Sequence, residues 1–128
     1  MFKNKIMYEI DVDAKIVYLY FAGEIASSNI IKTHTQAIND EKYNKDFNWI
    51  IDFRKGKQLF NKIKSFIDFF KKKSEYFQHV KMAFILGSPK QIAEFNNLVN
   101  QFESNNISII AKKVSSKKAA YEWILSKD

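Results

Sequence analysis

Two residues of opposite charge at the end of an apolar segment are the first candidates for a functional site. The segment "FNWIIDF", residues 47–53, contains Asp52 and is followed by Arg54 and a basic turn. If the segment is a parallel strand, its carboxyl end lies where ligands bind in open α/β sheets. Asp52 and Arg54 would then contact a ligand or partner. They could also be structural, with Asp52 accepting a hydrogen bond from a nearby amide and Arg54 solvated or paired.

Serines and lysines at two predicted helix starts form a second candidate site. Backbone amides at a helix start, together with lysines, suit a phosphate, a carboxylate or an acidic protein surface. The residues that could form this anion-binding rim are Ser88, Lys90, Lys112, Lys113, Ser116, Lys117 and Lys118. The chain is rich in lysine throughout, so the alternative is a solvated and salt-screened surface.

No residue pattern indicates catalysis, a cofactor or a metal centre. The chain has two histidines and no cysteine, which excludes disulfides and thiolate-bound zinc. His34 falls on the apolar side of a predicted helix, and His79 has no acidic or hydroxyl neighbour in sequence. Ser115 and Lys118 fit Ser-x-x-Lys but lack its companion motifs. We therefore expect a protein that is not an enzyme and needs no cofactor.

Composition narrows the possible partners. The chain has 128 residues, 46% of them hydrophobic, and a formal net charge of +7. No apolar run reaches the roughly 18 residues of a membrane span, and no signal peptide is evident, so a cytoplasmic protein is expected. The charge could attract nucleic acid, but nearly all the cations are lysines spread along an Asn- and Ile-rich chain. Nucleic acid is therefore a less favoured partner than protein.

Hydrophobic patterning predicts a single domain, residues 1–128, with alternating strands and helices. Residues 6–11 alternate, and residues 15–21 are rich in β-branched and aromatic side chains. With the polar turn between them, they predict an antiparallel hairpin. Ser and Asn in "EIASSN" are candidate N-caps for a first helix, and residues 47–53 form a buried strand. Then come a helix over 61–74, a strand over 80–86, a helix begun by Ser88 and Pro89, a strand over 107–111 and a helix over 117–125.

The predicted order is therefore β-β-α-β-α-β-α-β-α. Strands that alternate with helices require parallel crossovers, and the opening hairpin adds an antiparallel edge. The expected fold class is α/β, with a single mixed sheet covered by helices. The helix over 61–74 and the residues just before it are unusually rich in phenylalanine. Phe60, Phe66 and Phe69 could line an apolar ligand site or a dimer contact, or belong to the core.

Several segments resemble the SpoIIAA-like members of the STAS superfamily. They are the opening hairpin, "WIIDFR", "KMAFILGS", "ISIIAKK" and the closing "SSKKAAYEWI", with Ala119, Ala120, Trp123, Ile124 and Leu125 at its end. The resemblance covers essentially the whole chain. It implies a mixed sheet of four or five strands and a role in protein binding or regulation. The related architecture of CRAL-TRIO lipid carriers implies a small apolar ligand as an alternative.

The chain departs from that family at its regulatory residue. Antagonist STAS domains carry a phosphorylatable Ser or Thr in the turn after the strand that "WIIDFR" resembles. Here the turn reads "RKGKQLFNK", and the first hydroxyl beyond it is Ser65. The phosphorylation switch and the anti-sigma-antagonist role are therefore not carried over to this chain.

Three functions remain open on the sequence alone. The first is a non-catalytic regulatory or protein-interaction module, whose partner is another protein. The second is a carrier or sensor of a small apolar or anionic lipid-like ligand, and the third, least favoured, is nucleic-acid binding, which requires lysines and exposed aromatic residues on one face. The sequence does not distinguish a monomer from a homodimer.

Overall fold

The structure, a computed structural model, describes residues 4–57 and 62–126. Its strands are β1 (Lys5–Asp11), β2 (Ile16–Gly23), β3 (Asn48–Gly56), β4 (Lys81–Ile85) and β5 (Ile110–Val114). Its helices are α1 (Ser27–Ile38), α2 (Ile63–Lys72), α3 (Pro89–Ser104) and α4 (Lys117–Leu125), with a 3₁₀ turn, η1 (Ser74–Tyr76), after α2. The predicted α/β class and the predicted order of elements are confirmed.

The five strands form one sheet in the order β1-β2-β3-β4-β5. β1 pairs with β2 in antiparallel fashion, and all the other neighbours are parallel. Each strand therefore lies beside the strand that precedes it in the sequence. The order never reverses among these strands, so this sheet lacks the reversal point at which doubly wound folds form a ligand crevice.

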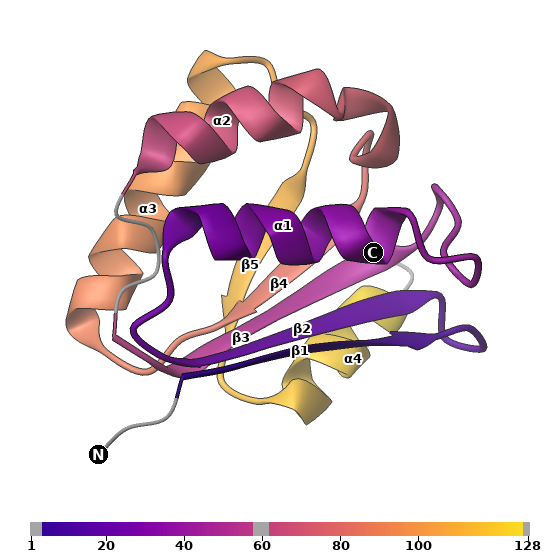
Figure 1. Cartoon of the computed structure of the whole chain (residues 1–128), viewed down its shortest axis with the longest axis horizontal. Helices are drawn as coiled ribbons and strands as arrows, with labels where there is room; N and C mark the ends of the chain where they lie inside the picture. Colours follow the sequence, from indigo (N-terminus) through magenta and orange to yellow (C-terminus); the bar gives the residue numbers. More distant parts are fainter. Residues whose placement is uncertain (1–3, 58–61, 127–128) are drawn as a thin grey trace.

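The sequential order also decides how the helices are distributed. Parallel crossovers are right-handed, so crossovers that all advance in the same direction place their helices on the same face of the sheet. Figure 1 shows α1, α2 and α3 together on one face and α4 alone on the other. The two faces carry separate hydrophobic clusters.

The core beneath α1, α2 and α3 is rich in aromatic side chains. Trp49 on β3 stacks on His34 of α1 with ring centroids 5.4 Å apart. Phe69, Phe70 and Phe77 meet the His34 ring from other sides. Aromatic pairs of this kind contribute about 0.5–1.5 kcal/mol beyond their buried area. The phenylalanine-rich part of the chain thus supplies the centre of the main core.

The face opposite carries a smaller core that α4 completes. Ala120 and Ile124 of α4 pack on Ile50 of β3 and on Ala83 and Ile85 of β4. Ser116 caps the helix, since its Oγ accepts a hydrogen bond from the amide of Ala119 at 3.0 Å. At the other end, Lys81 Nζ donates to the carbonyl oxygens of Trp123, Ile124 and Ser126, at 3.1, 3.4 and 3.3 Å. A cation at a helix C-terminus is favourable, so Lys81 fastens α4 to the sheet.

Two local predictions are wrong. The last strand was expected over 107–111, but β5 spans Ile110–Val114. Ile107 and Ile109 instead pack against the main core in the connection from α3. The first helix was expected to have a Ser or Asn N-cap, but its N-cap is Ala26, which makes no side-chain capping bond. Ser88 and Ser116 are N-caps as predicted.

Within the described part of the chain, no helix is long and apolar enough to cross a membrane.

Candidate functional site

The face that carries α4 is only partly covered. α4 packs on β3, β4 and β5, and its Lys117 and Tyr121 reach β1 at Glu9 and Asp11. The start of β1 and the carboxyl ends of β2 and β3 remain open on the same face. Met7 is 39% exposed there, Tyr20 is half-buried and Arg54 is exposed. Met7 and Tyr20 are directly opposite in the β1–β2 register, and Tyr20 is opposite Asp52 in β2–β3. We call Met7, Tyr20 and Arg54 the open patch.

Asp52 lies under this patch and is fully buried. Its carboxylate accepts hydrogen bonds from the Arg54 guanidinium, from Nε at 3.1 Å and from Nη2 at 2.8 Å. The hydroxyl of Tyr18 donates to Asp52 Oδ2 at 2.6 Å, and the amide of Arg54 donates to Oδ1 at 3.3 Å. The buried carboxylate is thus fully hydrogen-bonded and fixes the direction of the arginine side chain.

The hydrogen bonds also set the protonation states of the cluster. Burial raises the pKa of Asp52, but the bonds from Arg54 and Tyr18 outweigh burial and hold that pKa below its usual value. Burial and the bond to Asp52 together raise the pKa of the Tyr18 hydroxyl. The carboxylate is therefore charged and the phenol neutral at physiological pH. Neither is poised to exchange a proton near pH 7, which general acid–base catalysis requires.

The predicted anion-binding rim is divided between several places. Neighbouring strand residues point to opposite faces: Lys112 lies over the Trp123 ring, 5.7 Å from its centroid, and Lys113 is on the side of α3. Lys117 Nζ is 3.0 Å from Glu9 and 4.1 Å from the centroid of the Tyr18 ring. Lys90 and Lys118 are exposed. Of the five rim lysines, Lys117 is thus placed beside Tyr18, which is bonded to Asp52 and through it to Arg54. Lys112 and Lys113 lie on opposite faces of the sheet.

The carboxyl edge between β3 and β4 is filled by a side chain that the sequence did not single out. Gln91 is 1% exposed. Its Nε2 donates to the carbonyl oxygens of Phe53 at 3.0 Å and Gly56 at 2.6 Å, and its Oε1 accepts from the amide of Gly87 at 2.6 Å. A Cβ atom at Gly87 would lie 2.5 Å from the carbonyl oxygen of Arg54. The two loops are therefore locked together, which leaves no room for a ligand between them.

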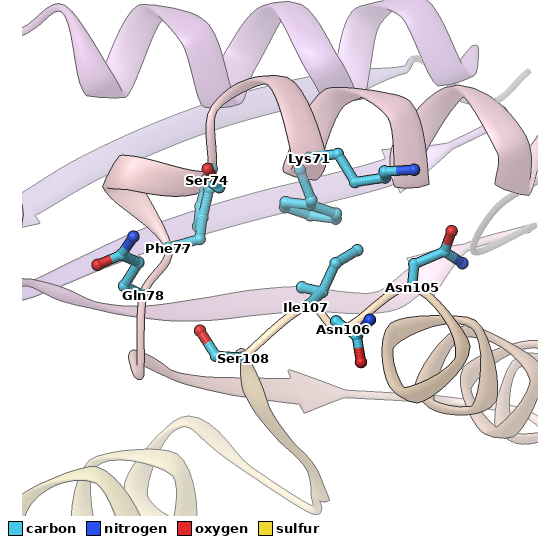
Figure 2. A pocket seen from close by; sticks show the side chains of 9 residues that line it. Lys71, Ser74, Phe77, Gln78, Asn105, Asn106, Ile107 and Ser108 are labelled. Atoms are coloured by element: carbon cyan, nitrogen blue, oxygen red, sulfur yellow. The ribbon is translucent and has the colours of Figure 1, made fainter.

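The phenylalanines proposed as ligand or dimer contacts have different positions. Phe66 is 0% and Phe69 is 9% exposed, and both belong to the main core. Phe60 lies outside the described residues. A groove of about 350 Å³ lies between the α2–η1 segment and the connection from α3 to β5. Figure 2 shows the side chains that line it. Phe70, Phe77 and Ile107 line it with polar residues from both sides, whereas Phe66 and Phe69 do not.

Comparison with known proteins adds no assignment. No family model matches the chain, and no curated protein matches it. Among residues 4–57 and 62–126, no group of three metal-binding side chains is close enough to hold an ion.

Three important residues were missed by sequence reasoning. Tyr18 reads as an ordinary strand residue, and its bond to Asp52 depends on the pairing of β2 with β3. Gln91 sits in the first turn of a helix, where nothing in the sequence marks it as buried. Trp49 was assigned only to a strand, yet its Nε1 is buried. Neither this atom nor the buried His34 Nε2 has a hydrogen-bond partner among the residues that the structure describes.

Proposed function

We propose that this protein is a non-catalytic protein-interaction module that binds its partner through the open patch. The proposal retains the regulatory role implied by the resemblance to SpoIIAA-like domains, without the phosphorylation switch. The observation that carries it is the arrangement of Asp52 and Arg54. Arg54 keeps 44% of its side chain exposed while its guanidinium is bonded to a carboxylate that is 0% exposed.

This arrangement suits binding because Arg54 is held in place before a partner arrives. An arginine side chain normally loses rotamer freedom on binding, which costs affinity. Here Asp52 and Tyr18 have already fixed its direction, and the N–H groups not used by Asp52 remain available to a carboxylate. Arg, Tyr and Met are enriched in protein interfaces, and Arg and Tyr often dominate the binding energy. The open patch contains one of each.

The experiment compares Arg54→Gln with Lys64→Gln. Both variants lose one positive charge, but Lys64 is 88% exposed on α2, which covers the other face. Proteins retained from an extract of the producing cells are quantified on the wild type and on both variants. We expect a protein that the wild type and Lys64→Gln retain and Arg54→Gln loses. Equal retention on all three would contradict the proposal. Urea unfolding of each variant checks that it is folded.

The alternative is a carrier or sensor of a small apolar or anionic lipid-like ligand. Phe66 and Phe69 belong to the main core of the described residues, which argues against a ligand contact at these two side chains. The groove at Phe70 and Phe77 is its remaining support. Native mass spectrometry of protein purified without detergent separates the two functions: an additional lipid-sized mass supports the carrier, and a bare mass supports the interaction module.

A further inference from the structure

The two edges of the sheet are very different as surfaces for strand pairing. Among the residues that the structure describes, no strand pairs with β1 or with β5 on its outer side. An exposed edge offers free backbone N–H and C=O groups to another strand, unless charges at its centre oppose pairing. β5 has Lys112 at its centre and Lys113 beside it. β1 has the half-buried Tyr8 at its centre, preceded by Ile6 and Met7, each 39% exposed.

The charges of β1 are arranged with opposite signs toward its two ends. Lys5 is at the start of the strand, Glu9 is beyond its centre and Asp11 is at its end. An antiparallel second copy of the same strand would therefore set a positive end against a negative end. We propose that the protein forms a homodimer in which β1 pairs with β1 of a second copy, joining two sheets of five strands into one continuous sheet.

A two-fold axis at Met7 gives a register in which residues 5–9 of the two copies form compatible cross-strand pairs. Lys5 lies opposite Glu9 of the second copy, and Met7 lies opposite Met7. On the other face, Ile6 lies opposite Tyr8. Pairs of opposite charge and aromatic–aliphatic pairs both stabilise antiparallel strands. Moving the axis to Tyr8 would set Lys5 opposite Asp11 but Met7 opposite Glu9. The Asp11 carboxylate already accepts hydrogen bonds from the Ala14 amide and the Tyr121 hydroxyl, so the Met7 register is favoured.

Pairing through β5 is disfavoured for the same reasons. An antiparallel copy centred on Lys112 would place two ammonium groups directly opposite each other, and like charges at that position are destabilising. Pairing β1 with β5 of another copy would be a head-to-tail contact, which continues into open-ended assemblies. Only the β1–β1 contact is both self-complementary and closed. A strand edge of this length is a small interface, so we expect a monomer–dimer equilibrium that depends on concentration.

The dimer is tested by sedimentation velocity over a series of protein concentrations, with two charge reversals. In Lys5→Glu, two carboxylates face each other in each cross-strand pair; in Glu9→Lys, two ammonium groups do. Each variant alone should have a dimer dissociation constant raised on the order of tenfold or more. An equimolar mixture of the two restores opposite charges in both pairs and should form dimers again.

Control variants keep the test decisive. Lys113→Glu makes the same charge change as Lys5→Glu, but on the opposite edge, and should dimerise like the wild type. Glu9 also pairs with Lys117, so if Glu9→Lys does not fold, Met7→Lys replaces it by placing two lysines on the axis. The inference is overturned if the wild type has only its 15.1 kDa monomer mass at every concentration. It is equally overturned if the β1 variants dimerise unchanged, or if Lys113→Glu abolishes the dimer.

The proposed dimer contact shares only Met7 with the open patch, and Arg54 tests the patch separately. Arg54→Gln should leave the dimer intact, because Arg54 is on β3 and outside the β1 edge. Failure of the dimer and failure of partner binding are therefore separate results.

Discussion

The guanidinium of Arg54 makes two hydrogen bonds, at 3.1 and 2.8 Å, to the carboxylate of Asp52, two residues earlier on the same strand. The Asp52 side chain is fully buried, whereas the Arg54 side chain is partly exposed to solvent. A buried carboxylate normally costs stability unless it is fully paired, and Tyr18 and Arg54 supply that pairing. The pair therefore has measurable consequences for stability as well as for binding.

Asp52→Asn should lower the free energy of unfolding by about 1–3 kcal/mol. The amide cannot accept from the guanidinium and from Tyr18 as the carboxylate does, and Arg54 loses its ionic partner. The loss is less than for a fully buried ion pair because Arg54 can be hydrated. Urea unfolding measures it. Asp68→Asn is the matched control: Asp68 pairs with Lys64 on the surface, and exposed pairs of this kind contribute about 0.3–0.5 kcal/mol. Equal effects of the two variants would refute the structural role of Asp52.

Gln91→Ala should destabilise the protein by about 2–4 kcal/mol, since two buried carbonyl groups and one amide lose their partner at once. Asn97→Ala, an exposed amide on the same helix, should change stability by less than about 0.5 kcal/mol. Urea unfolding of both variants makes the comparison. If Gln91→Ala matched Asn97→Ala, the link between the loops after β3 and β4 would contribute nothing to stability.

Acid should destabilise the protein through His34 before it affects Asp52. Burial lowers the pKa of His34 to about 4, from 6.5 in the unfolded chain. Between pH 6.5 and pH 4, His34 is protonated in the unfolded chain but neutral in the folded protein. The free energy of unfolding therefore falls as pH drops from 6.5 to 4. The integrated loss is about 3 kcal/mol. The pKa of Asp52 is lowered, so its contribution disappears only below about pH 4, near the unfolded value.

The measurement is chemical unfolding at a series of pH values for the wild type and His34→Leu. The aromatic side chains around His34 do not titrate in this range, so His34→Leu should show a much flatter profile between pH 6.5 and 4. A wild-type slope that persisted in the variant would assign the acid sensitivity to another group.

Lys81→Met should loosen α4 from the sheet. It removes a cation from the carbonyl oxygens at the end of α4, at a cost of about 0.5–1 kcal/mol. Hydrogen exchange of the α4 amides should therefore become faster. Lys112→Met is the control. Lys112 also lies over the Trp123 ring, but among the residues that the structure describes it has no hydrogen bond to the end of α4. If the α4 amides exchanged equally fast in both variants, the contacts with the Trp123 ring, and not the Lys81 hydrogen bonds to the carbonyl oxygens, would hold the helix.

The arrangement of elements was predictable because apolar spacing carries most of that information. The helix over 117–125 was predicted to the residue, since Ser116 and the apolar residues Ala120 and Ile124 mark both its start and its buried side. The last strand was misplaced because hydrophobicity identifies buried residues, not paired ones. Ile109 is buried and Ile107 is partly buried, both outside any strand, whereas Lys112 and Lys113 are in a strand but exposed at the sheet edge.

The candidate site was only partly predictable. Asp52 and Arg54 are two residues apart on a strand, so the sequence places them on one face. The contact with Tyr18 requires the pairing of β2 with β3, and the position of Gln91 requires the packing of two loops. Neither follows from local spacing. Lys112 and Lys113 show the reverse error: residues adjacent in sequence seemed to form one site, but a strand turns them to opposite faces.

The placement of α4 has a consequence for synthesis of the chain. Every strand that α4 covers precedes it in the sequence, and no other helix in the described part of the chain packs on that face. While the polypeptide is being made, Ile50, Ala83 and Ile85 can already lie in a paired sheet with their apolar side chains facing water. Until α4 leaves the ribosome, this apolar surface of the nascent protein stays exposed to water. A chaperone that binds apolar segments would bind there.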